Sequence, residues 1–496
     1  MPRDAGSGGY LGAAAMSTRA AAALVFCTSA AVLVLEILAG RLVAPYVGVS
    51  IETFTGVIGT VLAGIALGSA AGGRLADQRD ARPLLGPTVA LGGVLALVSL
   101  PVVSAVGPTV AGGGPGAIVV LAATAFFAPA AVLSAVSPMA AKLRLASLAE
   151  TGAVVGGLSA AGTAGALFGT FVTGFLLVAT VATRPLVLGL GAGLVIAGVA
   201  LWWRLGARRP APGALAALLI VAGVAGAAPG PCQEHTSYYC AQVEVDPSRP
   251  SGRTLVLDNL RHSYVDLADP THLEFRYVRL FADALDAELS GEQPVDALHI
   301  GGGGFSFPRY LAATRPGSTS LVLELDAGLV DLATRQLGLE TGPDLQVQVG
   351  DARTALAELG DERFDVAVGD AFGGLSVPWH LATVEVAEEL ARVLRPGGVY
   401  LANVIDGGPD RLVRAETATL QEAFAHVAVI APPTSAGDAP ANYVLVASRA
   451  PLAISPADVA SVDGVVLTGS AVDAFVDGAR PFTDDFAPAD QLLTRR

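Results

Sequence analysis

Cysteine is scarce in this sequence, which holds only Cys27, Cys232 and Cys240. Cys27 lies in an apolar run, where a thiol is most simply a small packing residue. Cys232 and Cys240 flank seven residues and could form a local disulfide, which would require an oxidising compartment. His235 lies between them, but the usual spacing of zinc ligands is absent, so we expect no metal site.

Charged residues are also few, at 15% of the chain against roughly 25% in an average soluble domain. Lysine and arginine together number 30, against 44 aspartates and glutamates, which gives a formal net charge of −14. Nucleic acid is excluded as a partner, because phosphates are bound by clustered basic side chains and no such cluster is present. Almost all the acids fall after about residue 230, so the sequence predicts an apolar first half and a soluble second half.

Long apolar runs fill the first half, after a Gly/Ala/Ser-rich stretch over 1–18 that we expect to be a disordered tail. Seven stretches approach the roughly 20 apolar residues that cross a bilayer. They lie near 20–40, 52–73, 84–106, 115–137, 154–178, 185–203 and 213–229, and the last is the shortest and least hydrophobic. We therefore expect a multi-pass protein of the cell membrane, in contact with the lipid bilayer.

The distribution of basic residues predicts the orientation of these spans. Arginine and lysine concentrate in alternate connections, which by the positive-inside rule places the amino terminus in the cytoplasm. Seven crossings would then put the second half outside the cytoplasm. If the weak seventh stretch does not cross, the second half lies inside.

One stretch of the second half combines a strand, a glycine turn and the start of a helix. Residues 297–300 predict a short, mainly apolar strand, residues 301–304 are all glycine, and a helix-compatible segment follows. Only residues without a Cβ let the backbone turn this sharply and let a ligand lie directly on it, as at the nucleotide-binding corner of a doubly wound sheet. An NAD-type site is disfavoured, because the third glycine of that fingerprint is missing.

Three further strands end in carboxylates. Glu324 follows Gly304 by about 20 residues, the spacing at which a carboxylate accepts hydrogen bonds from ribose hydroxyls. Asp351 and Asp370 end the next two strands. Glycines and acids that gather at one edge of a sheet predict a ligand site there. The alternatives are solvated rim acids for Glu324 and Asp351, and a helix N-cap for Asp370.

Strands and helices alternate from about residue 243 to 448, as a parallel sheet requires. We expect four parts after the tail: a transmembrane helical bundle over 19–230, a β-hairpin and helix region over 231–290, a Rossmann-like α/β domain over 291–450 and a C-terminal extension over 451–496.

Short motifs run through the second half: Leu257-Asp258 before His262, Glu274-Phe-Arg-Tyr277, the glycines at 301–304, Glu324 with Asp326, Gly350-Asp351, Asp370, and Leu394 to Gly398. Together they resemble the polyamine aminopropyltransferase (spermidine synthase) family. The apolar first half is similar to the membrane-fused bacterial branch of that family, in which a bundle of spans precedes the catalytic domain.

The resemblance implies decarboxylated S-adenosylmethionine as the donor and a small-molecule amine as the acceptor. By position, the glycines Gly301, Gly302 and Gly303 would approach this co-substrate. Glu324 would bind its ribose and Asp351 would read its adenine amino group. Asp370 falls where the family keeps its catalytic acid, and His262 stands where the family has a glutamine that contacts the ligand.

The chain departs from the family at three positions. Gly304 and Gly373 replace acids, and Val278 replaces a histidine. In the family these residues hold the cationic nitrogens of the polyamine, so the resemblance implies a nucleoside pocket with a poor polyamine clamp.

We therefore expect a membrane-bound, spermidine synthase-like aminopropyltransferase. The alternatives are an S-adenosylmethionine-dependent methyltransferase on the same fold and a non-catalytic nucleoside-binding module on a membrane bundle. Transport through the bundle is disfavoured, because several paired intramembrane charges are lacking. The sequence leaves open whether the chain forms a homo-oligomer.

Overall fold

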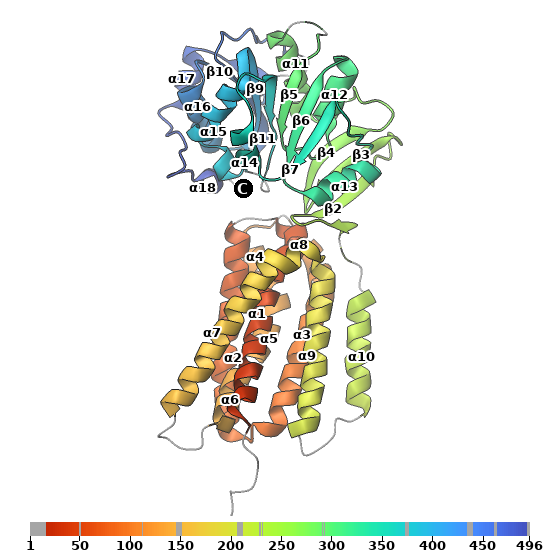
Figure 1. The fold of residues 1–496 in the computed structure, drawn as a ribbon, viewed down its shortest axis with the longest axis vertical. Helices are drawn as coiled ribbons and strands as arrows, with labels where there is room; N and C mark the ends of the chain where they lie inside the picture. The colour runs from red at the N-terminus through yellow and green to blue at the C-terminus, as the bar shows by residue number, and fades with distance from the viewer. Residues whose placement is uncertain are drawn as a thin grey trace, which may run out of the picture. The chain divides into compact units, whose positions relative to one another are not determined.

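The computed structural model describes residues 16–48, 51–111, 113–144, 151–205, 212–227, 230, 232–289, 291, 293–372, 376–433, 440–460 and 464–493. The expected tail over 1–18 lies almost wholly outside them. The chain divides into two compact units (Figure 1). One is Met1–Val47 with Glu52–Pro231 and is helical; the other is Gly48–Ile51 with Cys232–Arg496 and is α/β.

Six stretches of the helical unit are long and apolar enough to cross a membrane, judged by length and composition. They are α1 (Thr18–Val47), α2 (Ile51–Gln78), α3 (Arg82–Val110), Pro115–Arg144, Thr151–Leu177 and α9 (Thr183–Leu205). The fourth is made of α4 (Pro115–Ala122), the π-helix η1 (Ala123–Phe127), α5 (Ala128–Ser134) and α6 (Val136–Arg144). The fifth is α7 (Thr151–Val172) with η3 (Thr173–Leu177), after which α8 (Val178–Thr180) follows.

The seventh stretch differs from the prediction. Helix α10 (Pro212–Ala227) has only 16 residues in the described part of the chain. At about 1.5 Å per residue it is roughly 24 Å long, which is short of the roughly 30 Å hydrocarbon core of a bilayer. Within the described residues, six of the seven expected stretches therefore meet both the length and the hydropathy criteria, and α10 does not.

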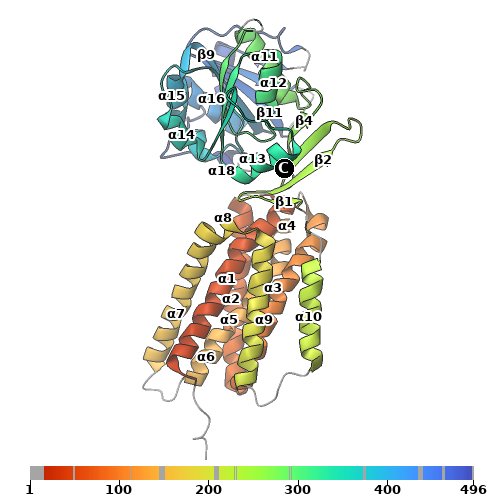
Figure 2. The same ribbon diagram turned by 45° about the vertical axis from the view of Figure 1, so that its right-hand side comes forward.

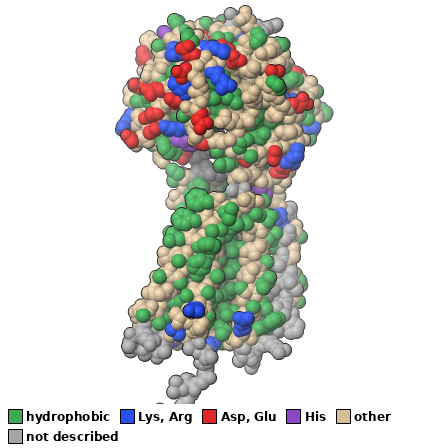
Figure 3. Space-filling view, in the orientation of Figure 1, with side chains coloured by type: hydrophobic (Ala, Val, Ile, Leu, Met, Phe, Trp, Pro, Cys, Tyr) green, Lys and Arg blue, Asp and Glu red, His purple; other side chains and the backbone are tan. Residues whose placement is uncertain are grey.

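Small residues bring the helices of this unit together. A Cβ atom at Gly68 of α2 would fall on the backbone of Ala131 in α5, so only glycine allows this approach. Within a bilayer such close packing replaces the hydrophobic driving force between helices. Figure 3 shows that the visible surface of this unit is largely hydrophobic, whereas acidic and basic side chains gather on the α/β unit.

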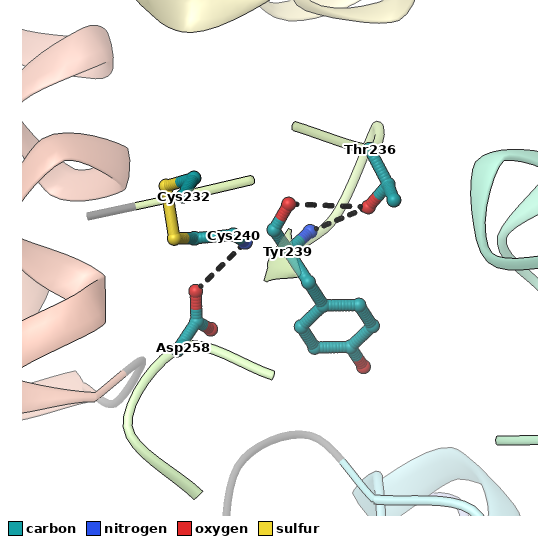
Figure 4. Close-up of a disulfide and its surroundings, with 5 residues drawn as sticks. All are labelled: Cys232, Thr236, Tyr239, Cys240 and Asp258. Atoms are coloured by element: carbon teal, nitrogen blue, oxygen red, sulfur yellow. Dashed lines mark hydrogen bonds between the residues drawn. A yellow bond between two sulfur atoms is a disulfide. The ribbon is translucent and has the colours of Figure 1, made fainter. Parts of the chain in front are cut away.

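The α/β unit begins with a small antiparallel sheet. Its strands are β1 (Glu234–His235), β2 (Cys240–Val245), β3 (Gly252–Leu257) and β4 (Leu260–Asp266), in the order β1-β2-β3-β4. A disulfide joins Cys232 to Cys240 at the start of β2 (Figure 4). Thr236 closes the turn by hydrogen bonds with the backbone of Tyr239, and Asp258 accepts a hydrogen bond from the Cys240 N–H.

The large sheet has the strand order β12-β10-β11-β9-β8-β5-β6-β7. Strands β5 (Asp296–Ile300), β6 (Thr319–Glu324), β7 (Leu345–Val349), β8 (Phe364–Gly369) and β9 (Leu394–Asp406) are parallel. Strands β10 (His426–Ala431), β11 (Ala441–Ser448) and β12 (Val465–Leu467) add to β9 in antiparallel fashion. The sheet is therefore mixed, and its parallel part is the Rossmann-like half that the sequence predicts.

Helices cover both faces of this sheet (Figure 2). On one face lie α14 (Ala352–Glu358), α15 (Val384–Val393), α16 (Arg411–Ala423), α17 (Ser470–Val476) and α18 (Ala489–Leu492). On the other lie α11 (Arg276–Glu288) and α12 (Ser306–Thr314), while α13 (Ala327–Gln336) packs against the small sheet. Because parallel strands end at one edge, the residues that follow β5, β6, β7 and β8 converge there.

Candidate active site

The carboxyl ends of four parallel strands open into one cavity of about 90 Å³. Its walls include most of the residues singled out in the sequence: Gly301, Gly303, Glu324, Asp351, Asp370 and His262. Gly302 belongs to the same turn and donates its N–H to Glu324. The structure thus gathers all seven residues around one pocket.

The glycine turn fits tightly between two strand ends. Gly301 has a φ of +91°, and a Cβ there would lie 2.6 Å from the backbone oxygen of Asp370. The Asp370 N–H in turn donates to the carbonyl of Ile300 at 2.9 Å. Glycine at 301 is therefore required both for the turn and for the approach of the strand that carries Asp370.

Glu324 is buried, with 6% of its surface exposed. Its Oε2 accepts the N–H groups of Gly302 at 2.8 Å and Gly303 at 3.3 Å, and its Oε1 accepts the N–H of Asp326 at 2.9 Å. Burial raises the pKa of this carboxyl, while the three backbone hydrogen bonds oppose the shift. A carboxylate oxygen offers about two lone-pair sites, so Oε1, which accepts a single N–H, keeps acceptor capacity for a hydroxyl of a ribose.

Asp351 caps helix α14, because its Oδ1 accepts the N–H of Thr354 at 3.0 Å. Its Oδ2 lies 3.1 Å from Nε2 of His380. Burial alone would raise the pKa of Asp351, but the Thr354 N–H and His380 lower it overall. The side chain is 41% exposed and therefore stays open to a ligand.

Asp370 is held from two sides. The Tyr277 hydroxyl donates to its Oδ2 at 2.9 Å and the Asn403 amide donates to its Oδ1 at 2.9 Å. Asn442 orients that amide by donating to Asn403 Oδ1 at 2.9 Å. Burial raises the pKa of Asp370 to about 6, against the effect of the two hydrogen bonds. In the described residues the next helix begins only at η4 (Trp379–Leu381), so Asp370 is not the N-cap of a described helix.

Aromatic rings form another wall of the pocket. The His262 ring lies 6.3 Å from that of Tyr239 and 6.4 Å from that of Phe372, between centroids. The Tyr239 hydroxyl donates to the backbone oxygen of Phe372 at 3.1 Å. Burial lowers the pKa of His262 to about 4, so this side chain is neutral at pH 7. Neutral rings of this kind attract a cationic ligand without adding a competing positive charge.

Two of the three positions at which we expect departures from the family, Gly304 and Val278, lie within the described residues. A Cβ at Gly304 would lie 2.7 Å from the Cβ of Ser263, whose hydroxyl accepts the Gly304 N–H at 2.9 Å. Strand β4 therefore occupies the space that an acidic side chain would need. Val278 is buried in the core beneath α11. Gly373 lies outside the described residues.

Sequence reasoning missed three residues of the site, namely Tyr239, His380 and Asn403. Asn403 could have been recognised, because it is the only strongly polar side chain in the apolar run 399–404. Tyr239 and His380 could not, because the small sheet and the 3₁₀ turn place them at the pocket through tertiary packing. Among the described residues, no three His, Cys, Asp or Glu side chains cluster as metal ligands would.

Comparisons with known proteins place this pocket in context. Residues 298–402 match the methyltransferase domain family. The polyamine aminopropyltransferase of Vibrio vulnificus is 32% identical over 152 residues, which are 30% of this chain and 49% of that protein. The eEF1A lysine and N-terminal methyltransferase of Danio rerio is 30% identical over 145 residues, which are 27% of this chain and 21% of that protein.

Among solved structures, a probable spermidine synthase from Corynebacterium glutamicum has 29% sequence identity and a TM-score of 0.48, covering 51% of this chain and 96% of that one. The chain spans about half or less of the length of the two curated relatives above. The family resemblance drawn from the motifs is confirmed: the α/β unit is similar to polyamine aminopropyltransferases and contains a methyltransferase-like domain.

Proposed function

We propose that the chain is a membrane-bound aminopropyltransferase, which moves the aminopropyl group of decarboxylated S-adenosylmethionine to a small amine. The observation that carries this proposal is the Asp370 carboxyl. It lies in the same pocket as the glycine turn and Glu324, is fixed by Tyr277 and Asn403, and has a pKa of about 6. A base with a pKa slightly below the working pH is mostly ionised and still accepts a proton readily.

The other residues of the pocket would bind the donor. Glu324 would accept hydrogen bonds from the ribose hydroxyls, and Asp351 one from the adenine amino group. The glycine turn at 301–303 lets the ligand lie against the backbone, since no Cβ intervenes. The rings of Tyr239, His262 and Phe372 would face the cationic sulfonium.

The transfer itself is a displacement at carbon. The lone pair of the neutral amine attacks the propyl carbon that is bonded to the sulfonium. As the C–N bond forms, the C–S bond breaks and its electron pair stays on sulfur, which leaves neutral methylthioadenosine. The new ammonium loses its extra proton to Asp370. The pocket supplies alignment and a proton acceptor, and no metal is needed for this step.

Methyl transfer is the second candidate. It is supported by the lack of space for an acid at Gly304, beside Ser263, and by the match of residues 298–402 to methyltransferases. Here S-adenosylmethionine would be the donor and the same carboxylate would accept the proton. The donor therefore distinguishes the two activities.

If the six stretches that are long and apolar enough all cross, the α/β unit would lie on the same side of the membrane as the amino terminus, and the positive-inside rule would make that side cytoplasmic. S-adenosyl donors are made in the cytoplasm, so this orientation supplies the substrate. The Cys232–Cys240 disulfide favours the opposite side, because such bonds persist in oxidising compartments.

The test uses the full-length protein in detergent or nanodiscs, incubated with each donor and a panel of small amines. Release of methylthioadenosine from decarboxylated S-adenosylmethionine, followed by mass spectrometry, supports the proposal. Release of S-adenosylhomocysteine from S-adenosylmethionine supports methyl transfer. The Asp370→Asn variant should bind either donor and turn over neither. Donor binding without any product would favour the non-catalytic module.

A further inference from the structure

One wall of the nucleoside pocket is formed by residues 376–383, the wall segment, which lies directly before α15. Pro378, His380 and Leu381 of this segment line the pocket. The described secondary structure of the segment is the single 3₁₀ turn η4, which two backbone hydrogen bonds close. The hydrogen bonds of a 3₁₀ turn have poorer geometry than those of an α-helix, so we expect contacts from elsewhere in the chain to hold the wall segment in place.

The C-terminal extension holds the wall segment at both of its ends. At the first end, the Ser376 hydroxyl donates to Oδ1 of Asp490. At the other end, the Thr383 hydroxyl donates to Oδ1 of Asp484 at 2.9 Å. Ser376 is 2% exposed and Thr383 is 1% exposed, so their hydroxyls are shielded from water, and hydrogen bonds are electrostatically stronger in such surroundings. Two carboxylates that are distant in sequence therefore fix the position of the wall segment.

Arg353 of α14 connects Asp484 to the middle of the wall segment. Its Nη1 and Nη2 donate to the two oxygens of Asp484, with a distance of 2.7 Å from Nη1 to Oδ1. The same Nη1 donates to the carbonyl oxygen of His380 at 3.1 Å. A bidentate pair of arginine and carboxylate has a defined geometry, so Asp484 orients the guanidinium that holds the backbone of His380.

His380 in turn contacts the carboxylate that is expected to meet the adenine. Its Nε2 lies 3.1 Å from Oδ2 of Asp351, while Oδ1 of Asp351 accepts the Thr354 N–H at 3.0 Å. The carboxylate is thus held at both oxygens, once by its own helix and once by the wall segment. If His380 moved away, the cap of α14 would persist, but Oδ2 would lose its constraint.

We propose that Asp484 is a positioning residue for adenine recognition: through Arg353 it holds His380 against Asp351 and thereby orients the carboxylate that meets the adenine amino group. The inference rests on the adenine contact in the proposed function and adds a part of the C-terminal extension to the site. Asp484 is 41% exposed and is not among the described residues that line the pocket, so its effect on the ligand is indirect. A binding group needs such support, because its geometry must be fixed before the ligand arrives.

The inference predicts a loss of discrimination rather than a general loss of affinity. The matched probes are methylthioadenosine and its analogue with hydrogen in place of the 6-amino group, because only the first can donate to Asp351. The matched variants are Asp484→Asn, which keeps the shape and removes the charge, and Asp485→Asn, which changes the exposed aspartate next to it. Arg353→Lys is a further variant, because lysine keeps the charge and loses the bidentate contact.

Binding of both probes is measured by calorimetry on the full-length protein, so that no turnover is needed. Asp484→Asn should weaken methylthioadenosine roughly two- to tenfold, the effect of losing about one hydrogen bond, and should leave the analogue unchanged. The ratio of the two dissociation constants then moves toward one. Asp485→Asn should change neither constant. Arg353→Lys should have the same effect as Asp484→Asn, and the double variant should lose no more than either single one, because both residues act through one contact.

The outcomes separate this inference from the proposed function. An unchanged ratio in Asp484→Asn, or an equal weakening of both probes, overturns the positioning role even if the enzyme forms product. A ratio that moves toward one, without any product from either donor, retains the positioning role and overturns the transferase. If methylthioadenosine does not bind to the wild type, both are overturned.

Thermal unfolding checks that the variants remain folded. An ion pair that is partly exposed contributes little to stability, so the Tm of Asp484→Asn should fall by no more than a few degrees. If Asp484→Asn does not fold, Arg353→Lys decides the question by the same ratio of dissociation constants.

Discussion

The hydrogen bond from Tyr277 to Asp370 allows a quantitative test of the proposed base. In Tyr277→Phe the ring still fills its buried position, but Oδ2 of Asp370 loses the donor that lies 2.9 Å away. This donor stabilises the ionised carboxylate, so its removal must raise the pKa of Asp370 above about 6.

The size of the shift follows from the energy of the bond. A hydrogen bond to a charged group contributes about 1.5–3 kcal/mol, and one pKa unit corresponds to about 1.4 kcal/mol. The pKa of Asp370 should therefore rise by about one to two units in Tyr277→Phe. At pH 7 the ionised fraction would fall from about nine-tenths to between about a half and a tenth. The expected loss in kcat/KM is roughly two- to tenfold at pH 7, and it should vanish near pH 9.

The assay is the pH dependence of kcat/KM for the variant divided by that for the wild type. The acceptor amine ionises near pH 10 in both proteins, so the ratio isolates Asp370. Tyr443→Phe is the control, because its hydroxyl donates to Asp410 at 2.8 Å, away from the pocket, and its ratio should stay flat. A ratio for Tyr277→Phe that does not change with pH would refute the role of Asp370 as the base.

Three further predictions concern the pocket and the orientation of the chain. Asp351→Ala should weaken the binding of methylthioadenosine at least tenfold, as measured by calorimetry, while the protein stays folded. Loss of the α14 cap should lower the free energy of unfolding by only about 1 kcal/mol. Unchanged affinity would contradict the adenine contact. Gly304→Asp should lower Tm and should not increase the affinity for amines, because β4 occupies the space that the new side chain needs. Adding Ser263→Gly to this variant should recover part of the lost Tm. A stable Gly304→Asp variant that binds amines more tightly would contradict this packing argument. If the α/β unit is cytoplasmic, a green fluorescent protein fused after residue 496 should fluoresce in a bacterial host, and an alkaline phosphatase fused there should be inactive. The reverse pattern would place the α/β unit outside the cytoplasm.

Much of the fold could be predicted from the sequence, because its signals are local. Apolar runs predicted the six stretches that are long and apolar enough to cross a membrane, and the alternation of strands and helices predicted the parallel part of the sheet. The seventh stretch contains α10, whose 16 described residues are fewer than the other six stretches have, because composition alone does not set the ends of a helix. Strand β12 was missed, since three residues carry too little pattern to be recognised.

The residues of the site likewise fall into those that local sequence patterns predict and those that depend on contacts between distant segments. Gly301, Asp351 and Asp370 follow strands and Glu324 ends one, so the geometry of a parallel sheet was enough to bring them together. Contacts between distant segments could not be predicted. Tyr239 reaches Phe372 across 133 residues of sequence, and Tyr277 reaches Asp370 across 93.

The ring wall formed by Tyr239, His262 and Phe372 has a consequence for the end of the catalytic cycle. The rings would attract the donor through its sulfonium charge, and the proposed transfer removes that charge by leaving a neutral thioether. His262 is uncharged at pH 7 and so contributes no compensating attraction to the product. The affinity of this wall for the nucleoside therefore falls at the moment the bond to sulfur breaks, and the chemistry itself favours departure of the spent co-substrate.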